Sequence, residues 1–166
     1  MSEKNKRDVS IVKKTNASER SDEFFMREAL RLAERALQHD EVPVGAVIER
    51  SGKIIARAFN LRQTKRQATY HAEILAINKA CAKMKDFRLN DCTMFVTLDP
   101  CPMCVGAILN ARLKSVVFGA SINKEGAIGA RELASRAMLN SNTIIEKGCL
   151  EKECSTIVST YFKNKR

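Results

Sequence analysis

Two short motifs, His71-Ala72-Glu73 and Pro100-Cys101-Pro102-Met103-Cys104, contain the residues of this chain that are best suited to holding a metal ion. His71, Cys101 and Cys104 are good zinc ligands, and a zinc site with three protein ligands keeps a fourth position open for water. Glu73 stands two residues after the histidine, where a proton carrier is a better interpretation than a fourth ligand. The pattern therefore predicts a hydrolytic metal site.

The spacing of the motifs predicts that the ligands lie at helix starts. Cys101 and Cys104 are separated by three positions at the beginning of a helix expected over residues 101–111, so both sulfurs share one face. A helix N-terminus also favours the thiolate over the thiol. His71 begins a second expected helix, over residues 71–84. We therefore expect two helix starts to face one ion from opposite sides.

Each motif alone is weak evidence, because a single Cys-x-x-Cys is more often structural or redox-active and His-x-Glu arises often by chance. Their combination, 30 residues apart, favours a catalytic metal. A closed structural zinc site would need a fourth ligand, and the candidates are Cys81, Cys92, Cys149, Cys154 and His39. The apolar patterns around the first two indicate core positions, the next two lie far away in sequence, and the histidine is expected to end a helix.

Length and composition indicate one globular domain, since the chain has 166 residues of which 45% are hydrophobic. The net charge of +10 favours a polyanionic partner such as nucleic acid, although a solvated basic surface would give the same charge. The sequence shows neither a secretory signal nor an apolar stretch of membrane-spanning length. Six cysteines without a secretory signal indicate a reducing compartment, so we expect a cytoplasmic protein.

Hydrophobic periodicity predicts alternating helices and strands after a flexible basic arm at residues 1–20. The expected helices cover residues 22–39 with Asp22 as the cap, 71–84, 101–111 and 150–162. The expected strands cover residues 44–48, 54–58, 92–98, 115–119 and 143–147, with loops at 59–69 and 121–130. This order predicts that residues 21–166 form an α/β layered domain with helices packed on a central sheet.

Residues 22–166 resemble the bacterial tRNA-specific adenosine deaminases of the TadA type, within the cytidine deaminase-like superfamily. Besides the two metal motifs, the resemblance rests on Glu41-Val42-Pro43-Val44-Gly45-Ala46, Asn60 and Val116-Val117-Phe118-Gly119-Ala120. It implies a three-layer α/β/α cytidine deaminase-like fold, with helices on both faces of a central mixed five-stranded sheet. It also implies one Zn²⁺ per subunit, Glu73 as the catalytic residue, and hydrolysis of the wobble adenosine (position 34) of a tRNA anticodon to inosine.

The same resemblance implies substrate contacts and a homodimer. Asn60 matches a base-contacting asparagine of the family, although the sequence alone would also suit a turn residue. Val44 matches an apolar pocket wall, although it could equally be part of the strand core. Pro100 lies beside the metal motif and is also expected to contact the substrate. The C-terminal tail pairs aromatic and basic side chains, so Phe162, Lys165 and Arg166 are expected to contact the anticodon stem-loop. The alternative is a helix that packs its aromatics internally.

Three positions depart from the family pattern: Tyr70 stands where a small residue is usual, Ile122 where an acidic residue is usual, and Ala130 where a serine is usual. These departures leave the metal motifs intact but affect the expected contacts with the nucleotide. Two other functions therefore remain open at this stage. One is deamination of another base or nucleoside, of the cytosine or guanine type; the other is a non-catalytic, zinc-stabilised RNA-binding module.

Overall fold

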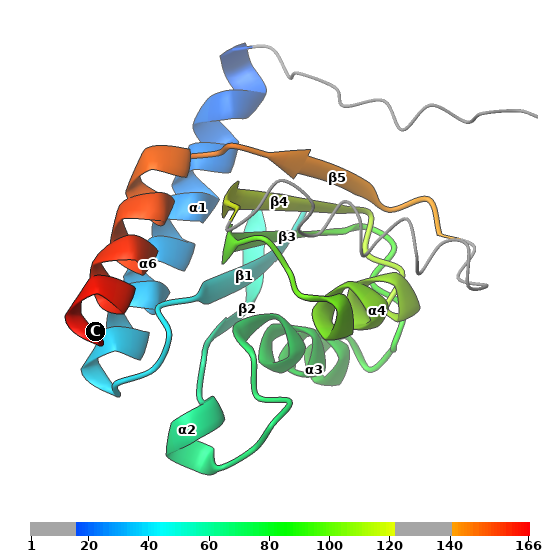
Figure 1. Cartoon of the computed structure of the whole chain (residues 1–166). Coiled ribbons are helices and arrows are strands. Elements are labelled where there is room, and N and C mark those ends of the chain that lie inside the picture. Colours follow the sequence, from blue (N-terminus) through cyan, green and yellow to red (C-terminus); the bar gives the residue numbers. More distant parts are fainter. Residues whose placement is uncertain (1–15, 122–140) are drawn as a thin grey trace, which may run out of the picture.

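A mixed five-stranded sheet forms the centre of the fold (Figure 1). The computed structural model describes residues 16–121 and 141–166, with side chains from Asp22 onward. The strand order is β2-β1-β3-β4-β5; β1 pairs antiparallel with β2 and β3, whereas the β3–β4 and β4–β5 pairs are parallel. The strands are β1 (Gly45–Arg50), β2 (Lys53–Phe59), β3 (Cys92–Leu98), β4 (Ser115–Ala120) and β5 (Ile144–Lys147).

Helices cover both faces of this sheet, which confirms the predicted three-layer α/β/α architecture. On one face lie α1 (Asn16–Gln38) and α6 (Glu151–Asn164), and on the other lie α3 (Ala72–Met84) and α4 (Pro102–Asn110). The side chains alternate accordingly: Phe95 of β3 stacks on Phe25 of α1, while Phe118 of β4 lines a small apolar cavity together with Val105 of α4. A short helix, α2 (Arg62–Lys65), stands outside the layers.

The predicted order of elements is confirmed over the described residues, and the predicted ends mostly lie within two positions of the observed ones. Two predictions are wrong. Helix α1 begins at Asn16 rather than Asp22, because Ala, Glu and Arg in residues 16–21 are good helix formers and extend it into the predicted arm. Helix α2 lies in a predicted loop, since four residues are too few to show a helical period. The predicted 121–130 loop, with Ile122 and Ala130, lies almost wholly outside the described residues.

Gly45 allows α1 to pack directly on the sheet. A Cβ at this position would overlap the carbonyl oxygen of Ala29 and lie 2.7 Å from the backbone nitrogen of Ala33. Because both atoms belong to the α1 backbone, they cannot move away without displacing the helix. We expect Gly45→Ala to lower the free energy of unfolding by about 1–3 kcal/mol or more, measured by urea denaturation.

Gly106 provides the matched control for this prediction, because a Cβ there would have nothing within 4 Å. Gly106→Ala, in the middle of α4, is expected to raise the free energy of unfolding by about 0.5–1 kcal/mol. Equal stabilities for the two alanine variants would contradict the close approach of α1 to β1.

No helix within residues 16–121 and 141–166 has the length and apolarity needed to cross a membrane.

Candidate active site

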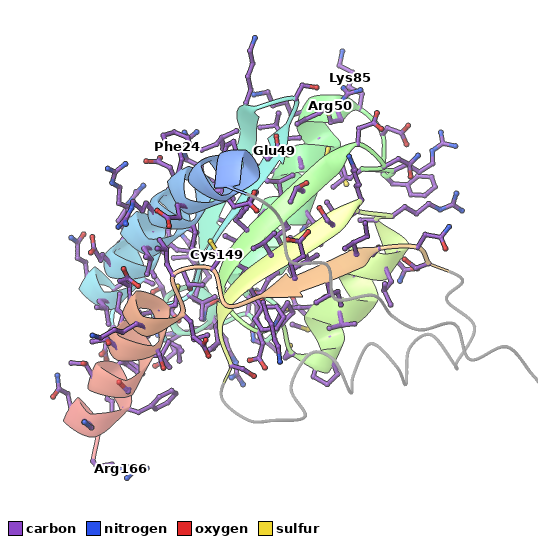
Figure 2. The ribbon with its side chains drawn as sticks, turned by 90° about the horizontal axis from the view of Figure 1, so that it is seen from above. Phe24, Glu49, Arg50, Lys85, Cys149 and Arg166 are labelled. Atoms are coloured by element: carbon purple, nitrogen blue, oxygen red, sulfur yellow. The ribbon has the colours of Figure 1, made fainter. Side chains whose placement is uncertain are left out.

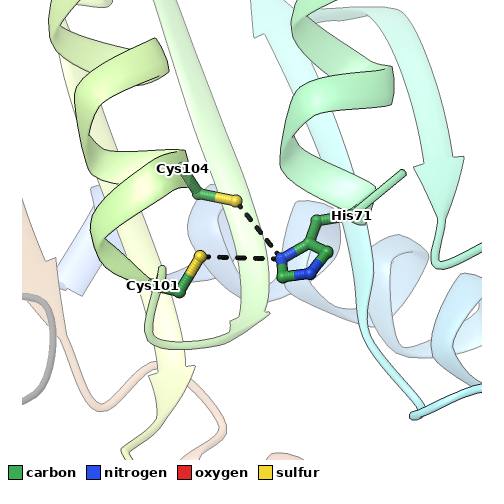
Figure 3. Close-up of side chains that lie close together, drawn as sticks. All are labelled: His71, Cys101 and Cys104. Carbon is green, nitrogen blue, oxygen red and sulfur yellow. Dashed lines mark hydrogen bonds between the residues drawn. The ribbon is translucent and has the colours of Figure 1, made fainter. Parts of the chain in front are cut away.

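Two helix starts on the same face of the sheet hold the three candidate metal ligands. His71 is the N-cap residue of α3 and Cys101 is the N-cap residue of α4, with Cys104 in the first turn of the same helix. Figure 3 shows the histidine ring and the two thiols turned toward one another from the facing helices. The structure thus brings together the three residues that the sequence motifs predicted.

The spacing of the ligand atoms fits a tetrahedral ion. Nδ1 of His71 lies 3.6 Å from the Sγ atom of Cys101 and 3.6 Å from that of Cys104, and the three atoms lie within 4.8 Å of one another. Zinc bound at about 2.3 Å to sulfur and about 2.0–2.1 Å to nitrogen with tetrahedral angles separates these atoms by about 3.6 Å. The donor set and its geometry therefore suit zinc.

The site supplies three protein ligands rather than four. Among the described residues, the group of potential ligand atoms contains only these three side chains. The residues considered as a fourth ligand of a closed structural site all lie outside this cluster: Cys81, Cys92, Cys149, Cys154 and His39. Cys92 and Cys154 are buried in the core, and His39 follows the end of α1, where its Nδ1 lies 2.9 Å from the Arg35 carbonyl oxygen. The arrangement is that of an open site.

The two thiols have opposite pKa shifts because they share a hydrogen bond. The bond from Cys104 lowers the pKa of Cys101 to about 4, assisted by His71, while the same bond and burial raise the pKa of Cys104. The hydrogen bond with Cys101 raises the pKa of His71, and the positive charge of Arg62 acts in the opposite direction. A divalent cation displaces the protons on its ligands, so metal affinity should increase with pH.

Glu73 is a buried carboxyl group next to these ligands, with only 4% of its surface exposed. Burial raises its pKa to about 7, and a side-chain hydrogen bond with Cys104 acts in the opposite direction. A carboxyl group with a pKa near neutrality both accepts and releases protons readily. This burial and this pKa suit the proton-relay role that the sequence predicted for Glu73.

Asn60 connects the strand layer to the start of α3. Its Oδ1 accepts a hydrogen bond from the Ala72 N–H at 2.9 Å, and its own N–H donates to the Val44 carbonyl at 3.1 Å. Both Asn60 and Val44 are buried. Because Oδ1 already has a backbone partner, the side-chain NH₂ is the part of the amide best available to a ligand. Sequence reasoning predicted the contact with a base but not this structural role.

The other predicted substrate contacts lie in different surroundings. Pro100 is buried and lines a small apolar cavity with Val105 and Phe118. At the C-terminal tail, Phe162 is 43% exposed, and Lys165 Nζ pairs with Asp40 at 2.6 Å. Arg166 stands at the exposed end of the chain (Figure 2).

Glu41 is a further residue near the site, to which the sequence analysis gave no role. It is 1% exposed, and its Oε1 accepts a hydrogen bond from the Thr64 N–H of α2 at 2.7 Å. The signal for it was the second of two consecutive carboxylates, Asp40 and Glu41, directly before the apolar run Val42-Pro43-Val44. Such a carboxylate, if buried, needs a partner, and here the partner is the backbone of α2.

Comparisons with known proteins agree with this fold and site. The model of the MafB19-like deaminase family matches residues 20–166. The tRNA-specific adenosine deaminase of Bacillus subtilis is 42% identical over 146 residues, which cover 87% of this chain and 91% of that protein. This chain belongs to the tRNA-specific adenosine deaminase family. It is accordingly a hydrolytic deaminase, and the resemblance seen in the sequence is confirmed.

Solved structures place the deaminase in the same fold. The structure of a tRNA:A34 deaminase aligns with a TM-score of 0.75 at 37% identity, covering 81% of this chain and 98% of that one. A guanine deaminase from Nitrosomonas europaea aligns with a TM-score of 0.72 at 26% identity, covering 84% and 83%. The fold therefore serves more than one purine substrate.

Proposed function

We propose that this deaminase converts the wobble adenosine of a tRNA anticodon to inosine, with one Zn²⁺ per subunit held by His71, Cys101 and Cys104. The observation that carries the proposal is the three-ligand cluster with buried Glu73 beside it. The high identity to a relative named tRNA-specific adenosine deaminase supports the choice of substrate. A non-catalytic zinc module is disfavoured, because the described residues offer no fourth ligand at the cluster.

Zinc bound by these residues would supply a Lewis acid and a water molecule activated at neutral pH. Glu73 takes a proton from the attacking water and delivers protons to the purine ring nitrogen and to the departing amino group. Adenosine and water are consumed, and inosine and ammonia are released. One carboxylate can serve all transfers because the protein buries it beside the ligands, within reach of a water and a base bound there.

Substrate binding is assigned to the residues around this centre. The Asn60 amide donates to the purine edge, Val44 and Pro100 provide apolar walls, and the base is flipped out of the anticodon loop to reach them. Phe162, Lys165 and Arg166 contact the RNA. Lys165 can exchange Asp40 for a phosphate at low cost, because an exposed ion pair stabilises a protein by only about 0–1 kcal/mol.

The assembly and cellular setting are further parts of the proposal. We propose a homodimer acting in the cytoplasm, with residues 1–20 as a basic arm that is helical from Asn16 onward and residues 21–166 as the deaminase domain. The net charge of +10 supports a polyanionic substrate, and the family match over residues 20–166 supports the boundary.

The test is incubation of the protein with tRNA bearing adenosine at the wobble position, followed by sequencing for inosine. We expect inosine at that position, with one equivalent of ammonia released. Parallel reactions with guanine, cytosine and free adenosine measure ammonia alone. Ammonia from a free base without inosine in tRNA would contradict the proposal and favour a function like that of the guanine deaminase relative.

A further inference from the structure

The segment that joins Asn60 to His71 is strongly basic. Its ten residues, Leu61–Tyr70, include Arg62, Lys65 and Arg66 and no acidic residue. All three cations are exposed, and within the described part of the chain none of them forms an ion pair. Elsewhere on this surface several basic side chains pair with carboxylates, as Lys165 does with Asp40. Three exposed cations that form no ion pair within residues 22–121 and 141–166 suit an anionic ligand.

Hydrogen bonds hold this segment in one shape. Its two ends are joined by the Leu61 N–H, which donates to the Tyr70 carbonyl at 3.1 Å. Inside it, the Gln67 N–H donates to the Arg62 carbonyl at 3.0 Å, and the buried Glu41 carboxylate accepts the Thr64 N–H. The cations are therefore presented on a fixed backbone, which reduces the entropy lost when a ligand binds.

The same segment lies beside the active site. It runs directly from Asn60 to His71, and the Asn60 side chain accepts a hydrogen bond from the Ala72 N–H at 2.9 Å, so both ends of the segment are fixed at the site. It also lies near the C-terminal tail, because the consecutive residues Asp40 and Glu41 bind Lys165 and Thr64, respectively. Figure 1 shows α2 and the C-terminus at the same end of the molecule.

We propose that Arg62, Lys65 and Arg66, called here the basic turn, bind the backbone phosphates of the nucleotides next to the base that enters the site. The inference rests on the proposed function and adds to it the residues that distinguish a polynucleotide from a free nucleoside. One guanidinium group can donate two parallel hydrogen bonds to a phosphate group. Such contacts fix the register of a nucleic acid on a protein. The basic turn thus positions the anticodon loop, while the residues of the candidate metal cluster act on the base.

The test compares two triple variants with the same loss of charge. The first replaces Arg62, Lys65 and Arg66 by glutamine. The control replaces Lys53, Lys83 and Lys114 by glutamine; all three are exposed. They lie at the start of β2, in the last turn of α3 and directly before β4, which are the ends of these elements away from the site. Figure 2 shows Arg50 and Lys85, the neighbours of this region, far from Arg166.

Single-turnover deamination of an anticodon stem-loop RNA, measured against protein concentration, gives a half-saturation concentration and a maximal rate. For the basic-turn variant we expect the half-saturation concentration to rise about tenfold or more, with a much smaller change in maximal rate. The logarithm of the half-saturation concentration should rise less steeply with the logarithm of the salt concentration, by about 2 in slope. Each single-strand phosphate contact contributes about 0.7 to this slope, and the variant loses three cations. Thermal unfolding should be unchanged, which separates a binding role from a structural one.

The outcomes separate this inference from the proposed function. If the wild-type protein forms inosine and the two triple variants bind and react alike, the basic turn has no phosphate-binding role. An equal loss in both variants would indicate a general effect of net charge and would also overturn the inference. A wild-type protein that forms no inosine in RNA would contradict the proposed function itself.

Discussion

Glu73→Gln is expected to lower the rate of inosine formation by about 10²–10⁴-fold or more while leaving the metal content unchanged. The amide has nearly the same shape as the carboxyl group but cannot accept a proton from water. Because Glu73 is 4% exposed and burial disfavours its charged form, the neutral amide should not destabilise the fold. Single-turnover kinetics, zinc analysis and thermal unfolding of the same preparation measure the three quantities.

Glu34→Gln serves as the control, since Glu34 is an exposed glutamate of α1 outside the site. It should retain the wild-type rate and metal content. A Glu73→Gln variant that still forms inosine at the wild-type rate would remove the proton relay from the mechanism. A variant that loses its zinc would instead show that Glu73 is needed to hold the ion, contrary to its proposed role.

The cluster of His71, Cys101 and Cys104 could be predicted from sequence because its determinants are local. The spacing of Cys101 and Cys104 on one helix start fixes the position of two ligands, and His71 at the start of another helix supplies the third. The sheet then only has to bring two helix starts together, which the alternation of strands and helices already implied. The predicted closeness of the three side chains and the predicted layers therefore agree with the structure for the same reason.

The surroundings of the site could not be predicted in this way, because they depend on contacts between distant residues. The bond from Thr64 to Glu41 spans 23 positions and the pair of Lys165 with Asp40 spans 125, and neither leaves a period in the sequence. Asn60 shows the same limitation. Its residue type suggested a turn or a base contact, whereas its bond to Ala72 appears only once the strand and the helix are placed together.

Those distant contacts explain why the basic turn escaped the sequence analysis, which treated residues 59–69 as an ordinary exposed loop. Polarity alone does not distinguish a solvated loop from a fixed one. Only the hydrogen bonds at its base and the buried Glu41 show that the backbone carrying its three cations is held in one shape between Asn60 and His71. A group of basic residues in a sequence predicts an anion-binding site only when the structure shows that their backbone is ordered.

Cys101→Ser is expected to remove most of the bound zinc and, with it, most of the deaminase activity. Zinc strongly prefers thiolate to hydroxyl ligands, so a serine leaves two protein ligands at the cluster. Serine is also a favourable N-cap residue, and Cys101 occupies the N-cap of α4. The substitution therefore removes a ligand without removing a cap, and loss of metal can be separated from loss of the helix.

Zinc analysis should give about one ion per chain for the wild type and far less for Cys101→Ser. Chelation of the wild-type protein should lower its thermal midpoint by roughly 10 °C, because an ion at a thousand times its dissociation constant stabilises the folded state by about 4 kcal/mol. The Cys101→Ser variant should unfold near the midpoint of the chelated wild type and should not respond to chelator.

Cys81→Ser is the matched control, because Cys81 is a partly buried cysteine of α3 that lies outside the ligand cluster. This variant should keep its zinc and its response to chelator, whatever small loss of stability the added hydroxyl causes. Equal zinc loss in both serine variants would contradict the assignment of the ligands. Full zinc occupancy in Cys101→Ser would do the same, since it would require the ion to be held by other side chains.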